Sequence, residues 1–120
     1  MPTPKEIAQR LSGELKVDIN EEGTKVWLLN GELHREDGPA IEFANGDKKW
    51  YLNGKRHRKG GPAVEKADGT REWWVNGKLH REDGPAVEWA NGDKEWFLNG
   101  HILRVENILA QGKILEKDPQ

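Results

Sequence analysis

The sequence predicts an all-β protein, an elongated antiparallel β-meander of four 23-residue repeats with a short helix at each terminus. Three series of residues with a 23-residue period support this prediction. They are an Asn-Gly pair, a tryptophan and a second turn sequence that ends in glycine: Asn30, Asn53, Asn76 and Asn99; Trp27, Trp50, Trp73 and Trp96; Gly23, Gly46, Gly69 and Gly92. A fixed period of this length indicates stacked supersecondary units, none of which buries its apolar face alone.

Each unit is predicted to consist of hairpins. Asn-Gly between alternating apolar runs is the strongest short hairpin signal, because both central residues of a type I′ turn need a positive φ. We expect Asn91-Gly92 to form a two-residue turn as well, which pairs Val87 with Trp96. Side chains alternate between the faces of a strand, so this pairing puts the tryptophans and β-branched residues of each unit on one buried face. On this facing Trp73 is buried and Trp74 lies on the other side.

Both ends depart from the repeat, which is expected to occupy residues 21–100. Residues 1–20 are expected to form a cap, with a capping box at Thr3–Glu6, a helix over residues 4–12 and a lead-in strand over residues 15–19. Residues 101–120 are expected to form a second cap. There the spacing of Ile102, Val105, Ile108 and Leu109 predicts a C-terminal helix that ends near Gly112, followed by a tail.

Composition and charge limit the function classes. The 120-residue chain has no cysteine, which excludes disulfides and thiolate chemistry. Its net charge of −2 excludes a simple polycation and a strongly acidic nucleic-acid mimic. No stretch approaches the roughly 20 apolar residues of a membrane span, and the N-terminus lacks the apolar run of a signal peptide. We therefore expect a soluble, cytoplasmic, single-domain protein.

The string Trp50-x-x-Asn-Gly-Lys-Arg-His57-x-x-x-Gly61, followed by Ala67-Asp68-Gly69, resembles a MORN repeat. That family has the same period, an Asn-Gly-Lys-x-His turn and an Ala-Asp-Gly or Ala-Asn-Gly turn. Where many members have His-Gly-x-Gly, this chain has His34-Arg-Glu-Asp-Gly38. It is therefore similar to the divergent MORN-like repeats of bacteria, phages and large viruses, some of which are described as antitoxin components. The resemblance implies an elongated sheet used for protein contacts, phospholipid binding in some members, and no catalytic residues.

The His-Arg-Glu-Asp sequence, at residues 34–37 and again at 80–83, is the candidate catalytic feature. A base, a cation and two carboxylates side by side could serve general acid–base catalysis in a hydrolase. However, the second unit keeps His57 and Arg58 and replaces the acidic pair with Lys59 and Gly60. A catalytic site needs one copy, whereas a structural device recurs with the structure. We therefore interpret these residues as turn chemistry and predict that the protein is not an enzyme.

The recurring histidines His34, His57 and His80 are the candidate metal ligands. Successive units of an extended sheet are at least two strand spacings apart, so the imidazoles should lie about 10 Å or more from one another. Zinc–nitrogen bonds are about 2 Å long, so zinc ligands must converge far more closely. We predict neither a metal site nor a cofactor.

Charge is unevenly distributed along the chain. Residues 44–66 carry 7 basic and 2 acidic residues (net +5), between residues 21–43 with 2 and 6 (net −4) and residues 67–89 with 3 and 5 (net −2). This alternation favours a protein partner with complementary potential, because charge complementarity confers specificity and a high association rate. It could also be a solvated edge with scattered charge. Binding of nucleic acid or anionic phospholipid by the basic unit is the other alternative.

The second face of the sheet is predicted to carry an aromatic column opposite the small residues Ala40, Ala63 and Ala86. Aromatic residues are enriched at interface hot spots, so this column is a candidate contact surface if the terminal helices leave it open. We accordingly predict a non-catalytic module that binds a protein, as an inhibitor or adaptor such as an antitoxin or a phage antagonist of a host system; homodimerisation stays open. The predicted partner-binding residues are Lys48, Lys49, Tyr51, Lys55, Arg56, Arg58, Lys59, Trp74 and Phe97.

Overall fold

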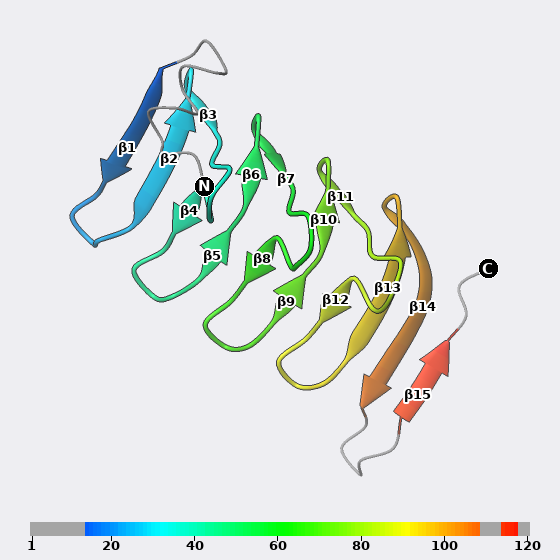
Figure 1. Ribbon diagram of the computed structural model, residues 1–120. Coiled ribbons are helices and arrows are strands. Elements are labelled where there is room, and N and C mark those ends of the chain that lie inside the picture. The colour runs from blue at the N-terminus through cyan, green and yellow to red at the C-terminus, as the bar shows by residue number, and fades with distance from the viewer. Residues whose placement is uncertain (1–13, 109–113, 118–120) are drawn as a thin grey trace.

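The computed structural model describes residues 14–108 and 114–117, and this part of the chain is all-β (Figure 1). One antiparallel sheet has the strand order β1-β2-β4-β5-β8-β9-β12-β13-β14-β15, with β3 paired to β2, and two small hairpins, β6-β7 and β10-β11, stand beside it. The strands are β1 Leu15–Ile19, β2 Lys25–Leu29, β3 Glu32–Leu33, β4 Ile41–Glu42, β5 Lys48–Lys49, β6 Tyr51–Leu52, β7 Lys55–Arg56, β8 Val64–Glu65, β9 Arg71–Glu72, β10 Trp74–Val75, β11 Lys78–Leu79, β12 Val87–Glu88, β13 Lys94–Leu98, β14 His101–Ile108 and β15 Ile114–Lys117. The predicted all-β, antiparallel, meander-like fold is confirmed.

The molecule is elongated. Its principal extents are 51 × 30 × 23 Å and its Cα radius of gyration is 16.6 Å, against about 14 Å for a compact chain of this length. Figure 1 shows why: the strands form one long row, with hairpin tips along one edge and wider turns along the other. The described residues include no helix long and apolar enough to cross a membrane.

The Asn-Gly turns are two-residue hairpin turns, as predicted. Their asparagines have φ between 50° and 53°, and the glycines that follow have φ between 78° and 82°. These positive values belong to the type I′ turn, which Asn-Gly adopts at the lowest steric cost. The turns join β2 to β3, β6 to β7, β10 to β11 and β13 to β14.

The second turn type differs from the prediction. Around Asn91-Gly92, Trp89 N donates to Asp93 O and Gly92 N donates to Trp89 O, so the loop has three residues rather than two. Only the glycine has a positive φ, 98°, because Asn91 Oδ1 accepts a hydrogen bond from Asp93 N at 2.9 Å and holds an Asx turn. The geometry is that of a type I turn followed by a glycine bulge.

The extra loop residue corrects the predicted facing. Val87 pairs with Glu95, not with Trp96, and Glu88 pairs with Lys94. A one-residue shift moves every side chain of a strand to the other face, so the tryptophans do not share a face with the β-branched residues. Trp73 and Trp74 are both half-buried, and the expected contrast between them is wrong. The buried residues are Trp27, Leu29, His34, Ala40, Ala63, Val64, Thr70, Ala86 and Val87.

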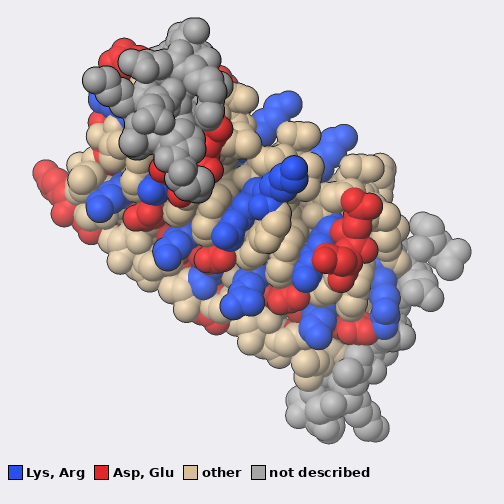
Figure 2. Space-filling view, viewed as in Figure 1, with Lys and Arg blue, Asp and Glu red and all other residues tan. Residues whose placement is uncertain are grey.

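On the tryptophan face, the paired residues of the main sheet alternate in charge from strand to strand. Lys25 pairs with Glu42, Glu42 with Lys48, and Lys48 with Glu65. From Glu65 the series continues to β13 and β14 through Arg71, Glu88, Lys94 and Glu106. Figure 2 shows this charge ladder as a diagonal row of alternating blue and red side chains. Opposite charges on directly opposed residues stabilise neighbouring strands.

The two ends have different outcomes. The lead-in strand is confirmed as β1, which pairs with β2. The helix predicted for residues 4–12 lies outside the described residues. The C-terminal helix prediction is wrong for residues 101–108, because they form β14, which pairs with β13 and β15. Pairing on both sides gives the backbone groups of residues 101–108 strand partners, and this tertiary context overrides the helical spacing of four apolar residues.

Candidate functional site

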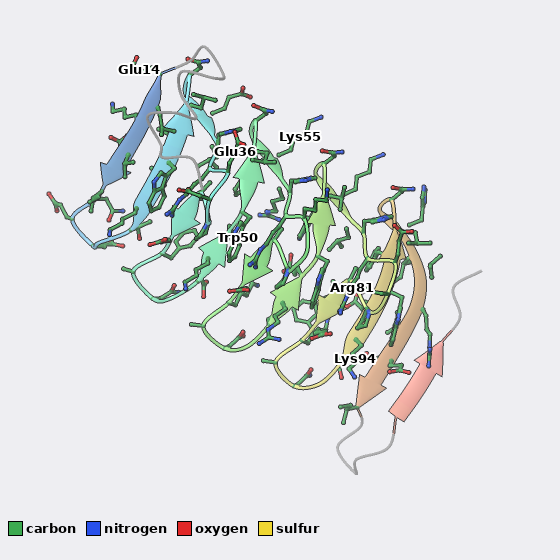
Figure 3. The ribbon with its side chains drawn as sticks, viewed as in Figure 1. Glu14, Glu36, Trp50, Lys55, Arg81 and Lys94 are labelled. Carbon is green, nitrogen blue, oxygen red and sulfur yellow. The ribbon has the colours of Figure 1, made fainter. Side chains whose placement is uncertain are left out.

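Three short loops leave the sheet at the same place in successive units. Trp50 N donates to Ala63 O while Trp50 O accepts from His57 N, so both strand partners of Trp50 come from one segment that bulges out between them. The same two bonds are made at Trp27 and at Trp73. We call the segments 34–39, 57–62 and 80–85 loop 1, loop 2 and loop 3. Figure 3 shows Trp50 and Arg81 midway between the hairpin tip at Lys55 and the opposite edge near Lys94.

An arginine anchors each loop to the tryptophan beneath it. The guanidinium carbon of Arg58 lies 4.0 Å from the ring centroid of Trp50, and its Nη1 donates to Pro62 O and to Glu65 Oε2, both at 3.0 Å. Arg35 and Arg81 lie 3.8 and 3.9 Å from the rings of their own tryptophans and make the same pair of bonds. The planar guanidinium suits this position because it can stack and bond through its edge at once.

A histidine ties each loop to the following unit. His34 Nδ1 accepts a hydrogen bond from Asn53 N at 2.9 Å, and His57 and His80 accept from the next two turn asparagines at 3.0 Å. A neutral imidazole that accepts at Nδ1 carries its proton on Nε2. In loop 1 this buried atom makes no hydrogen bond within the described residues, and Glu36 Oε2 lies 3.5 Å away.

The carboxylates of loops 1 and 3 also have structural partners. Asp37 Oδ1 accepts from Arg35 Nε at 3.0 Å, and Asp83 Oδ1 accepts from Arg81 Nε at 3.1 Å. The histidine, arginine and aspartate of the His-Arg-Glu-Asp sequence are therefore engaged in holding the loop on the sheet. The three histidines contact three different turns, and the described residues contain no cluster of three or more His, Asp or Glu that could hold a metal ion.

Two clefts lie between successive loops. The first, of about 570 Å³, separates loop 1 from loop 2 and is floored by Trp50 and Leu52. The second, of about 680 Å³, separates loop 2 from loop 3 and is floored by Trp73 and Val75. Both are open to solvent, and loop 2 forms a wall of each. Neither cleft encloses a space in which a small molecule would be largely buried.

The outer rims of these clefts alternate in charge. Loop 1 contributes Glu36 and Asp37 to the first cleft, and loop 3 contributes Glu82 and Asp83 to the second. The side chains of Glu82 and Asp83 are 84% and 89% exposed. Loop 2, between them, has Lys59 and glycine at the corresponding positions. A partner that spans the three loops therefore meets acidic, basic and acidic rims in turn.

The predicted partner-binding residues do not form one patch. Lys48 belongs to the charge ladder, and Arg58 and Lys59 line the clefts. Lys55 lies at the hairpin tip, with its stem over Gly77. By strand alternation, Lys49, Tyr51, Trp74 and Phe97 project from the opposite face, together with Arg56, which pairs with Tyr51.

On that opposite face the aromatic residues are half-buried, and two of them bond to neighbouring charged groups. Arg56 Nε donates to Tyr51 Oη at 3.1 Å, and its guanidinium carbon lies 4.9 Å from the ring centroid of Trp74. Trp74 Nε1 donates to Glu72 at 2.8 Å. The alanines that were expected to face this column, Ala40, Ala63 and Ala86, are fully buried.

Sequence reasoning missed the arginine anchors and the charge ladder, although both have a signal in the sequence. Arg35, Arg58 and Arg81 follow the tryptophans at a constant spacing of eight residues, and the ladder glutamates Glu42, Glu65 and Glu88 follow the arginines at seven. These offsets become meaningful only when the loop brings the three side chains together.

Comparison of the chain with protein-family models, curated proteins and solved structures finds no match.

Proposed function

We propose that the chain is a non-catalytic module that binds a protein partner along the face of loops 1–3, as an inhibitor or adaptor of the antitoxin or phage-antagonist kind. The proposal includes two further points: the chain is an array of four MORN-like units of 23 residues, and the protein acts in the cytoplasm. One observation carries it: the histidine and arginine of each loop are engaged in holding the loop, whereas charges of opposite sign on neighbouring loops, Lys59 of loop 2 and Glu82 of loop 3, are exposed to solvent.

The internal bonds argue against the hydrolase alternative. A general base must be within hydrogen-bond reach of the proton it removes, but Nδ1 of each loop histidine already accepts from a backbone amide. Losing that bond would leave a turn amide without its partner. The loops therefore serve as rigid supports for their rims.

The distribution of cations argues against a polyanionic ligand. Lys48 lies between Glu42 and Glu65 in the ladder, and Arg71 lies between Glu65 and Glu88. A nucleic acid or an anionic bilayer over this face would meet a carboxylate beside each of these cations. A protein surface with its own alternating charges meets no such penalty.

Affinity capture from cells of the native host, followed by association kinetics on the purified pair, tests the proposal. The wild type is compared with Glu82→Lys, which reverses the exposed charge on the rim of loop 3, and with Lys78→Glu, a matched single reversal at an exposed hairpin tip. We expect the loop variant to slow association and Lys78→Glu to leave it unchanged, because exposed rim charges act mainly on the encounter rate. Equal kinetics for all three proteins would contradict the proposal, as would binding to anionic liposomes in place of any protein.

A further inference from the structure

Loop 2 lacks a group that loops 1 and 3 both have. In those loops an aspartate two positions after the arginine accepts a hydrogen bond from the arginine Nε, at 3.0 and 3.1 Å. Gly60 occupies this position in loop 2. Arg58 keeps its Nη1 bonds to Pro62 O and Glu65, but its Nε has no hydrogen bond to any residue that the structure describes. Its side chain is 31% exposed, against 21% and 22% for Arg35 and Arg81.

The surroundings of Arg58 are open. Arg58 and Lys59 line both clefts, so this guanidinium can be reached from either side of loop 2. Gly60 has a φ of 86°, and a Cβ placed on it would have no heavy atom within 4 Å. Because Gly60 has no side chain, nothing from this position covers the Arg58 guanidinium, and the neighbouring Lys59 is exposed.

We propose that Arg58 binds, in trans, an aspartate or glutamate side chain of the protein partner. The incoming carboxylate accepts from Arg58 Nε, as Asp37 and Asp83 accept from Arg35 and Arg81, and Lys59 adds a second cation. This inference rests on the proposed function and names the contact that gives it specificity. Charge-assisted hydrogen bonds to a guanidinium are among the strongest polar contacts that a protein surface offers.

The neighbouring loops define what flanks this carboxylate. Loops 1 and 3 present acidic rims on either side of Arg58, so the partner residues beside the carboxylate must be basic. Equivalent strands of successive units are two strand spacings apart, which is about 9.4–9.8 Å. Three residues of a polyproline II helix rise about 9.3 Å and return to the same side of the chain. The geometry thus fits an extended segment with an acidic residue and a lysine or arginine three positions before and after it.

The probe that tests this is a capped peptide, Lys-Pro-Pro-Glu-Pro-Pro-Lys, titrated into the full chain and followed by the NMR signals of the arginine Nε–H groups. Two matched peptides are used: one with all three charges reversed, and one with glutamine in place of glutamate. We expect the first peptide to shift the Arg58 Nε–H signal and to leave those of Arg35 and Arg81 unchanged. The other two should bind about tenfold or more weakly, because they lack the charge-assisted bond.

Three protein variants complete the experiment. Lys59→Glu/Gly60→Asp gives loop 2 the sequence of its neighbours, but the φ of 86° at Gly60 strains any side chain there. Urea melts therefore establish first that this variant is folded, and Lys59→Glu alone, which leaves the backbone at Gly60 unchanged, is measured beside it. Both folded variants should lose peptide affinity, the double variant by about tenfold or more. Glu82→Lys/Asp83→Gly gives loop 3 the Lys-Gly-Gly sequence of loop 2, and the peptide should then shift the Arg81 Nε–H signal as well. Equal binding of the three peptides, or unchanged affinity in the loop 2 variant, would overturn the inference.

Failure of this inference can be distinguished from failure of the proposed function. If the captured native partner depends on the rim of loop 3 but binds the loop 2 variant as well as the wild type, the function stands and the carboxylate site does not. If no protein partner depends on the loop face, the proposed function fails. A single-stranded oligonucleotide or phosphatidylserine vesicles that bind more tightly than the peptide, with the binding lost in the loop 2 variant, would assign Arg58 to phosphate and overturn its assignment to a protein carboxylate.

Discussion

At the scale of single residues, arginines that stack on the tryptophans hold separate parts of this fold together. Arg81 stacks 3.9 Å over the ring of Trp73 and bonds to Asp83, Pro85 O and Glu88. It thus links the start of loop 3, the end of loop 3 and the charge ladder. Arg104, which comes from a strand rather than a loop, stacks over Trp96 at 4.6 Å and bonds to Glu106, so the last tryptophan has an equivalent cover.

Replacing Arg81 tests this role. Arg81→Ala should lower the free energy of unfolding by about 2–3 kcal/mol, because it removes the stacking contact, leaves Asp83 without its cation and takes from Glu88 one of its charged partners. Arg81→Lys should recover only a small part, since an ammonium group cannot stack and bond through several edges in the same way. Denaturant melts of both variants give the two differences. The exposed Lys78→Ala is the control. If Arg81→Ala lowered the free energy of unfolding no more than this control does, the structural role of Arg81 would be contradicted.

Asp68 is the one described residue with a resolved shift in pKa. The Thr70 amide, which donates to Asp68 Oδ1 at 2.8 Å, and then the Thr70 hydroxyl lower the pKa of this carboxyl below its ordinary value of 3.8. Thr70 Oγ1 in turn accepts from Ala90 N at 3.1 Å, so the Asp68 turn is linked to the next one. A lowered folded-state pKa contributes stability above the unfolded-state value, and this contribution is lost as pH falls through the folded-state value.

The change Asp68→Asn should therefore lessen the loss of stability on acidification below about pH 4 while leaving the turn intact. Asn45 and Asn91 make the same Asx bond at the equivalent turns, so asparagine fits this position. Carboxyl NMR titration of the wild type should place Asp68 below 3.8, and melts at pH 3 and pH 7 compare the variants. An Asp68 that titrates above this value would contradict the prediction.

At the scale of elements, the loops and the Asn-Gly turns support one another across units. Each loop histidine accepts a hydrogen bond from the turn asparagine of the next unit. The three turn glycines after Gly31 also receive a side chain from the preceding unit: Glu32 lies over Gly54, Lys55 over Gly77 and Lys78 over Gly100. A hairpin that is marginal by itself is thus fixed by contacts from both neighbours.

His34 gives the sharpest test of this coupling, because it is only 3% exposed. His34→Ala should cost about 2–4 kcal/mol, since it leaves a cavity and removes the acceptor of Asn53 N. The exposed His101→Ala should stay within about 0.5 kcal/mol of the wild type. Chemical denaturation measures both. If folded His34→Ala melts like the wild type yet has lost partner binding, the histidine contacts the partner and its structural assignment is wrong.

At the scale of the whole molecule, the charge ladder runs from β2 to β14. In an elongated repeat array each unit contacts only its neighbours, so cross-strand pairs supply much of its cohesion. The glutamates of the ladder are bonded again by the loop arginines, which joins the ladder to the loop face. Strand pairing and the shape of the binding face therefore depend on the same side chains.

Reversing one cation tests the ladder. Arg71→Glu places three carboxylates in a row with Glu65 and Glu88 and should cost about 1–2 kcal/mol, whereas Arg71→Lys should be nearly neutral. The difference between the two variants should shrink in 1 M salt, because the screening length falls to about 3 Å. Urea melts at low and high salt measure it. A difference that does not change with salt would mean that packing, rather than charge, is responsible.

The period, the Asn-Gly turns, the lead-in strand and the all-β class could be predicted from the sequence, because each depends on local backbone preferences and on the alternation of apolar residues. Asn30 and its equivalents adopt a positive φ wherever they stand before glycine between strands. The alternating charge of the three loops was also legible in the residue order.

The facing of the tryptophans, the strand at residues 101–108 and the role of the loop arginines depend on contacts between distant parts of the chain and could not be predicted. One extra turn residue moved Trp96 away from Val87, and a turn's residue count is set by hydrogen bonds that composition does not specify. The open edge of β13 made β14 a strand against its helical spacing. Arg58 could be recognised as lacking a carboxylate only once the other two loops showed where that carboxylate bonds, because the contact joins residues that the loop itself brings together.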